Sequence, residues 1–382
     1  MEKQTLRQSL EYLLQNADKL ETANTAVDYI NWLATDLNHN LSQPMYVDEY
    51  LPVIRSEQGH GDVFATVVMR TQGRRPEALR EALLCLYAQS DRDFEVVLIG
   101  HKLNEQQQAL VQQVLAEQEP EFRRQIRYFR LDTGTRTTPL NFGYAHARGE
   151  YITILDDDDI VLENWIASFR RAAQKKNGAM LHVMAYGQDW QVIDTAYGNQ
   201  ALRACHAPDA KYCVPFEMLE QIYMNRCPMS SWAIPGRAFR EMGILFDEAL
   251  TTTEDWDYFM RVAFVCGVSD EENPQVVYRT WLNAESSATV HNQDEWAKNY
   301  ELIQKKFEKT PIMLDIGTSR QSIRLVEQSH YARQIVSSRS WRAMQMAKDG
   351  IRRIQQHRVG RWLISGVWRV SLGAYRLLRK IR

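Results

Sequence analysis

The sequence predicts an α/β protein in which a mostly parallel sheet is flanked by helices. From residue 63 onward, short apolar runs alternate with amphipathic helical patterns, which is typical of βαβ units. The chain has 382 residues, of which 45% are hydrophobic and 25% charged, so it is large enough for one large or two ordinary folded domains. Helical patterns before residue 60 and after residue 300 predict helical N-terminal and C-terminal extensions.

The first half of the predicted sheet has four strands separated by helices. Strands are expected at 63–69, 94–100, 126–131 and 151–155, and helices at 75–89, 104–118 and 139–150. The last strand runs directly into four aspartates, Asp156 to Asp159. Because ligands bind at the carboxyl ends of parallel strands, we expect these aspartates to contact a ligand.

The second half is predicted to contain more helix than strand. We expect a helix over 160–176 with Asp159 as its N-cap, a strand at 178–186, a strand and helix within 229–243, and a helix over 251–267. The predicted domains are a helical extension at 1–60, a catalytic domain at 61–300 with halves 61–160 and 161–300, and a helical region at 301–382.

The four consecutive aspartates point to a cation. Two unit charges about 4 Å apart repel by roughly 4 kcal/mol at an effective dielectric constant near 20, so four neighbouring carboxylates need compensation. Asp156 and Asp158 stand at alternate positions, and hard oxygen ligands of this kind suit Mg²⁺ or Mn²⁺ bound with substrate phosphates. The alternative is an acidic turn that caps the next helix.

A second acidic cluster contains Glu254, Asp255 and Asp257. Acids in the first turn of a helix also favour the helix dipole, so a purely structural role is an alternative. A carboxylate held near the metal would instead act as a general base toward an acceptor hydroxyl.

Taken together, the two clusters resemble a known enzyme family. The segments VVMRTQGRRPEALREALLCLYAQSDRDFEVVLI, PLNFGYAHARGEYITILDDDD and FDEALTTTEDWDYFMR occur in this order over roughly residues 63 to 290. This arrangement resembles the family 2 glycosyltransferases of the GT-A fold, which implies a nucleotide-binding sheet and a metal-dependent inverting enzyme. The donor would be a nucleoside-diphosphate sugar, and the acceptor a hydroxyl of a glycan or lipid-linked acceptor in cell-surface polysaccharide synthesis.

The resemblance also implies roles for single residues. Asp156 and Asp158 would hold Mn²⁺ or Mg²⁺ as the DxD pair, and Thr71, Arg136, Asp156 and Asp157 would contact the nucleotide. Asp255 would be the catalytic base, with Glu254 as the second candidate. One departure is that Gly100 and His101 stand where the family commonly has aspartates that read the base.

Two other functions remain open from the residues. A nucleotidyltransferase would use a related sheet and acidic metal site, and would release pyrophosphate. A catalytically silent glycosyltransferase-like module would bind a partner or membrane through its tail.

The C-terminal tail is strongly basic. Residues 341–382 hold eleven Lys+Arg against one acid, and residues 361–381 plotted on a helix separate a basic face from an apolar one. This pattern favours an anionic membrane surface; packing on the catalytic domain or a second subunit is the alternative. Five scattered cysteines without a CxxC spacing and the lack of an apolar signal segment predict a cytoplasmic protein, peripheral on the inner membrane face. We expect no nucleic acid partner and consider a homo-oligomer possible.

Overall fold

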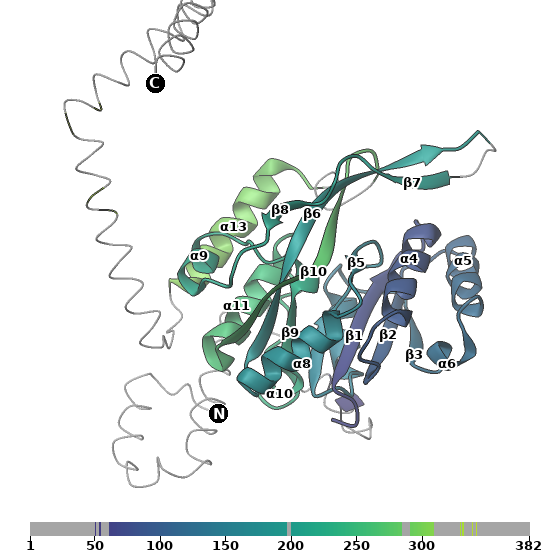
Figure 1. Cartoon of the computed structure of the whole chain (residues 1–382), viewed down its shortest axis with the longest axis horizontal. Helices are drawn as coiled ribbons and strands as arrows, with labels where there is room; N and C mark the ends of the chain where they lie inside the picture. The colour runs from purple at the N-terminus through teal and green to yellow at the C-terminus, as the bar shows by residue number, and fades with distance from the viewer. Residues whose placement is uncertain are drawn as a thin grey trace, which may run out of the picture. The chain divides into compact units, whose positions relative to one another are not determined.

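The computed structural model describes residues 61–196, 200–284 and 291–308, together with Tyr50, Val53, Ile54 and a few isolated positions beyond 328 (Figure 1). The predicted extension at 1–60 and the basic tail therefore lie almost entirely outside the described residues. Contacts divide the chain into units Met1–Met313 and Leu314–Arg382, and the description below concerns the first. In the described part of the chain, we find no helix with the length and apolarity needed to cross a membrane. The predicted domain boundaries remain predictions.

The first half of the sheet is parallel, as the sequence predicts. Its strands run in the order β3-β2-β1-β4, with parallel pairing throughout. They are β1 (Ala65–Thr71), β2 (Phe94–His101), β3 (Ile126–Leu131) and β4 (Tyr151–Ile154). The intervening helices are α4 (Pro76–Tyr87), α5 (Glu105–Ala116), the short α6 (Pro120–Arg123) and α7 (Thr138–Ala145). Pro76 starts α4 at a position where the missing N–H costs nothing, and Asn104 with Gln107 forms a capping box on α5.

The second half of the sheet is mixed. Strand β9 (Trp232–Pro235) pairs antiparallel with both β4 and β6 (Met180–Asp194). A long strand that the sequence did not predict, β10 (Val268–Trp281), runs parallel to β6. The short β5 (Ile160–Val161), β7 (Gln200–Ala204) and β8 (Asp209–Tyr212) complete ten strands within the described residues. Figure 1 shows β6 and β7 extending together beyond the sheet as an arm.

The prediction for residues 159–176 is partly wrong. Ile160 and Val161 form β5, and helix α8 begins only at Trp165 (Trp165–Lys175) after Asn164. Asp159 does not cap the helix: its carboxylate accepts hydrogen bonds from the Ser230 hydroxyl (2.9 Å) and the Arg279 backbone N–H (2.9 Å). Pairing of β5 with β10 holds Ile160 and Val161 in an extended conformation. No local sequence pattern could reveal that long-range contact.

Helices cover both faces of the sheet. Neighbouring residues on β1 illustrate this, because Val67 packs into one core cluster and Val68 into the other. The cluster with Val67 contains α4, α5 and α8. The cluster with Val68 contains α7, α10 (Gly236–Arg240), α11 (Glu254–Cys266) and α13 (Gln293–Phe307). The remaining helices are α9 (Met218–Tyr223) and the 3₁₀ turn η3 (Met229–Ser231).

A buried charge network fixes helix α11. Asp257 contacts the Arg261 guanidinium at 2.7 Å and the Lys306 ammonium at 3.0 Å, and Lys306 also contacts Asp247 at 2.6 Å. All four side chains are almost completely buried. Asp257, the third acid of the second cluster, therefore has a structural role, and it helps to hold the first turn of α11 in place.

Candidate active site

Four strands, β1, β2, β4 and β10, end around one cavity of about 370 Å³. Thr71 comes from the end of β1, His101 from the end of β2, and Asp156, Asp157 and Asp158 follow β4. The end of β10 closes another wall with Tyr278, Arg279, Thr280 and Trp281. A cavity therefore lies at the carboxyl edge of the sheet, where we expect the site from the sequence.

Each of the four consecutive aspartates has its own partner. The Asp156 carboxylate lies 3.4 Å from Nε of Arg70, and Asp157 accepts a hydrogen bond from the Thr71 hydroxyl. Asp158 accepts hydrogen bonds from Arg75 and from the indole N–H of Trp281, the latter at 2.8 Å. With Asp159 bonded to Ser230 and Arg279, side-chain cations and donors already offset the repulsion that the sequence implies.

Burial makes the carboxyl groups of Asp157, Asp158 and Asp159 easier to protonate than an ordinary aspartate. It raises the pKa of Asp157 to about 7, with the neighbouring charge of Asp158 as the next cause. Burial also raises the pKa of Asp158, against the opposing influence of Arg75, and it holds the pKa of Asp159 well above its usual range. Additional positive charge in the cavity would therefore favour the ionised forms.

The ends of β1 and β2 contribute Thr71 and His101 to the lining of the first cavity. The Thr71 hydroxyl also accepts a hydrogen bond from the backbone N–H of Gly73 (3.0 Å). The chain turns at Gly73, whose φ is +61°. At Gly100, an added Cβ would lie 2.4 Å from the Tyr128 hydroxyl, so no side chain fits there. His101 lines the cavity and contacts the Thr133 carbonyl oxygen at 3.0 Å. Burial lowers the pKa of His101, which favours the neutral imidazole.

A second cavity of about 260 Å³ adjoins the first and contains Glu254 and Asp255. The two cavities share five lining residues: Arg70, Arg136, Asp156, Tyr278 and Trp296. The aspartates after β4 and the acidic start of α11, which are about 100 residues apart in the sequence, therefore face a common wall.

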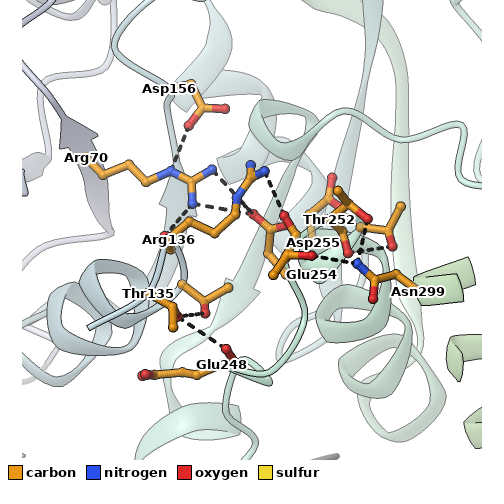
Figure 2. Close-up of polar contacts among 12 residues, drawn as sticks. Arg70, Thr135, Arg136, Asp156, Glu248, Thr252, Glu254, Asp255 and Asn299 are labelled. Atoms are coloured by element: carbon orange, nitrogen blue, oxygen red, sulfur yellow. Dashed lines mark hydrogen bonds and ion pairs between the residues drawn. The ribbon is translucent and has the colours of Figure 1, made fainter. Parts of the chain in front are cut away.

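Glu254 is tied into that wall by two arginines. Its Oε1 lies 2.9 Å from Nε of Arg136 and 3.4 Å from Nη1 of Arg70, as Figure 2 shows. Arg70 also donates to the Arg136 carbonyl oxygen (2.7 Å), and Arg136 to the Thr251 carbonyl oxygen (3.1 Å). The Glu254 side chain is only 2% exposed. Its charge is thus neutralised and its Oε1 is occupied by both arginines.

Asp255 has a different environment although it is the next residue. Its carboxylate accepts a hydrogen bond from the backbone N–H of Trp256 (2.8 Å) and a longer one from the side-chain amide of Asn225 (3.4 Å). Burial raises its pKa to about 7, with the charge of Glu254 as the second cause. A cavity-lining carboxyl group with a raised pKa is a candidate for acid–base chemistry near neutral pH.

The structure places the predicted residues in one site but adds others that the sequence did not indicate. Thr71, Asp156, Asp157 and Asp158 line the first cavity, Glu254 and Asp255 the second, and Arg136 both. Arg70, Arg75, Tyr278 and Trp281 also line the site and were not predicted. A weak signal was present, since Arg70 interrupts an otherwise apolar strand and Tyr278 to Trp281 follow the apolar pair Val276 and Val277.

Comparison with known proteins agrees with this arrangement. Residues 66–221 match the sequence model of the family described as glycosyl transferase family 2. An uncharacterized glycosyltransferase of Rickettsia felis is 27% identical over 224 residues, which cover 57% of this chain and 34% of that protein. A Rickettsia typhi protein described in the same way is 23% identical over 250 residues, covering 64% of this chain and 72% of the relative. The chain thus spans about a third of the length of the Rickettsia felis protein.

The fold is similar to that of a solved glycosyltransferase. The crystal structure of Staphylococcus aureus TarS residues 1–349 in complex with UDP-GlcNAc aligns with a TM-score of 0.50 and 16% identity. The alignment covers 66% of this chain and 68% of TarS 1–349, so the predicted GT-A-type fold class is confirmed. The family resemblance is confirmed as well, since residues 66–221 match the sequence model of the family 2 glycosyltransferases.

Proposed function

We propose that the protein is a metal-dependent inverting glycosyltransferase that moves a sugar from a nucleoside-diphosphate sugar to a hydroxyl group of a glycan or lipid-linked acceptor. The observation that carries this proposal is the pair of adjoining cavities. One contains the aspartates after β4, the other contains Asp255, and Arg70, Arg136 and Asp156 belong to both. A donor and an acceptor bound in these cavities would meet at the shared wall.

The first cavity suits a nucleoside diphosphate. Arg74, Arg75 and Arg279 line it together with Asp156 to Asp158, and guanidinium groups are suited to phosphate oxygens. Thr71, Asp157 and His101 lie at the ends of β1, β4 and β2, where ligands of parallel sheets bind. We therefore assign donor binding to this cavity, with Thr71 and Asp157 among the contacts to the nucleotide.

The residues present fit a divalent metal that is shared with the substrate. Asp156 and Asp158 both line the cavity and remain 27% and 16% exposed. Among the described residues, no three His, Cys, Asp or Glu side chains gather as a complete metal site. Mg²⁺ usually takes one or two carboxylates and completes its shell with phosphate oxygens and water. When bound here, Mg²⁺ or Mn²⁺ would neutralise the charge that develops on the departing diphosphate.

Asp255 is the better candidate for the catalytic base. Glu254 is held by Arg70 and Arg136 and is nearly inaccessible, whereas Asp255 lines the second cavity and its carboxylate accepts hydrogen bonds from the Trp256 backbone N–H and the Asn225 amide. A pKa of about 7 allows the Asp255 carboxylate to take a proton near neutral pH. We assign Glu254 the role of fixing the two arginines at the boundary of the cavities.

The reaction then follows as a single displacement. Asp255 takes the proton of the acceptor hydroxyl while the hydroxyl oxygen forms a bond to the anomeric carbon. The bond between that carbon and the phosphate oxygen breaks, and its electron pair leaves with the nucleoside diphosphate. Attack opposite the leaving group inverts the anomeric configuration.

The basic amphipathic segment at 361–381 supports a location on the inner face of the cell membrane and a lipid-linked or cell-surface glycan as acceptor. A vesicle-binding assay of the full chain tests this part of the proposal. Binding that rises with the fraction of anionic lipid supports it, and equal partition on neutral and anionic vesicles contradicts it.

A thermal-unfolding screen against UDP, GDP, dTDP and CMP, each with and without Mn²⁺, tests donor binding. UDP is the first nucleotide to try because TarS was crystallised with UDP-GlcNAc. Ligand at about 100 times its dissociation constant stabilises a fold by roughly 2.7 kcal/mol. We expect one nucleotide to stabilise the protein in a Mn²⁺-dependent way, and Asp158→Asn to abolish the metal dependence. No stabilisation by any nucleotide would contradict the donor site and favour a silent module.

A further inference from the structure

Both carboxylates assigned to the metal are engaged by arginines. Asp156 lies 3.4 Å from Arg70, and Asp158 accepts a hydrogen bond from Arg75. The arginine side chains are only 15% and 19% exposed, so solvent screens these pairs less than it would at the surface. A divalent cation that enters the cavity must compete with two guanidinium groups for the same oxygens.

The surroundings of Arg75 hold it in this competing position. Trp281 donates its indole N–H to the same Asp158 oxygen at 2.8 Å. The Arg75 guanidinium also lies over the Trp281 ring, 4.9 Å from its centroid, where a cation is attracted to the aromatic face. Asp158, Arg75 and Trp281 thus form a connected set rather than an accidental surface pair.

When every carboxyl group is ionised, the formal positive and negative charges around the cavity are equal in number without a metal. Five arginines line it, namely Arg70, Arg74, Arg75, Arg136 and Arg279, against the three aspartates 156–158. Two glutamates pair with these arginines from neighbouring elements, Glu254 with Arg70 and Arg136, and Glu81 with Arg279. A divalent cation alone would upset this balance. A metal together with a diphosphate would preserve it, because each phosphate of a nucleotide sugar carries a negative charge.

We propose that Arg70 and Arg75 are internal counter-ions that occupy Asp156 and Asp158 until a diphosphate arrives, so that metal and nucleotide bind together. The proposal rests on the function proposed above. As metal and diphosphate enter, the guanidinium groups leave the carboxylates and pair with phosphate oxygens, which accept their N–H groups in the same planar geometry. The two arginines therefore make metal binding conditional on the donor.

Titration with Mn²⁺, with the free ion followed by electron paramagnetic resonance, tests this without any transfer assay. For the full-length wild type, we expect weak binding of Mn²⁺ alone and at least tenfold tighter binding with UDP, or with whichever nucleoside diphosphate the unfolding screen selects. Arg75→Met and Arg70→Met should bind Mn²⁺ alone at least tenfold more tightly than the wild type, and should bind the nucleotide without metal less tightly. Arg75→Lys keeps the positive charge and should keep the weak binding of Mn²⁺.

Arg80→Met is the matched control. Arg80 lies on α4 close to Arg75 in the sequence, but it pairs with Glu77 and Glu117 at the surface, so this variant should titrate like the wild type. Thermal unfolding confirms that each variant is folded. The proposal is wrong if Arg70→Met and Arg75→Met bind Mn²⁺ no better than the wild type, or if the wild type binds Mn²⁺ equally well without nucleotide. A wild type that binds no nucleoside diphosphate with or without Mn²⁺ would instead overturn the proposed function, and this inference with it.

Discussion

Replacing Asp255 by asparagine should stabilise the fold while it removes transfer. The carboxyl group has a pKa of about 7 against an ordinary value of 3.8, and each pKa unit corresponds to about 1.4 kcal/mol. The ionised form is therefore disfavoured in the fold by at most roughly 4 kcal/mol at pH 8. Because the side chain keeps part of its exposure, we expect half of this or less, about 1–2 kcal/mol. For a domain of this size, that raises Tm by about 2–8 °C.

The pH dependence of this stabilisation tests whether the raised pKa of Asp255 is its cause. A carboxyl group whose folded pKa is raised costs nothing below the pKa of the unfolded chain; its cost grows as the pH rises from that value to the folded pKa and is constant above it. The advantage of Asp255→Asn should therefore be largest at pH 8 and fall to less than half by pH 5. Thermal unfolding in EDTA at both pH values measures it.

Glu254→Gln is the matched control and should have the opposite sign. It leaves Arg70 and Arg136 without their shared carboxylate, and removing one partner from buried ion pairs is destabilising. We expect a loss of about 1–3 kcal/mol, less than for a fully buried pair, because both arginines keep some exposure. Equal effects of the two substitutions, or a destabilised Asp255→Asn at pH 8, would refute the assignment of separate roles to these neighbours.

Three further substitutions test the scaffold and the donor cavity. Lys306→Met leaves Asp247 and Asp257 without their shared ammonium group and should lower the free energy of unfolding by about 3–5 kcal/mol in chemical denaturation; a loss below about 1 kcal/mol would contradict a buried network. Gly149→Ala places a Cβ 2.4 Å from the backbone nitrogen of Thr66 and should cost about 1–3 kcal/mol by the same method, whereas an unchanged midpoint would argue against this close approach. Thr71→Val removes the hydrogen bond to Asp157 and should weaken nucleotide binding by about tenfold in calorimetry, and unaltered affinity would place the nucleotide elsewhere.

Much of the fold could be predicted because its signals are local. The parallel strands β1, β2 and β4 are mostly apolar, and the helices between the strands begin at recognisable positions such as Pro76 and Asn104. Strand β10 was missed because residues 269–275 are almost entirely polar, with apolar residues concentrated from Val276 onward, and because its pairing partner β6 lies about 90 residues earlier. Asp159 was misassigned for a similar reason, since its partners Ser230 and Arg279 are distant in the sequence.

In the site, too, contacts between residues that are distant in the sequence could not be predicted. The two acidic clusters can be found in the sequence because consecutive carboxylates are unusual, but Glu254 and Asp255 look equivalent there. Only the fold brings Arg70 and Arg136, 184 and 118 residues away, to Glu254 and not to Asp255. Likewise, the pairing of Arg75 with Asp158 could not be read from their separation of 83 residues.

Proton NMR of the released sugar tests the central claim most directly. The full-length protein is incubated with Mn²⁺ and an α-linked sugar of the nucleoside diphosphate that the unfolding screen selects, with water serving as the acceptor. We expect the β-anomer to appear first, before mutarotation, and to be lost in Asp158→Asn. An α-anomer as the first product, or turnover that Asp158→Asn leaves unchanged, would contradict an inverting, metal-assisted transfer at this site.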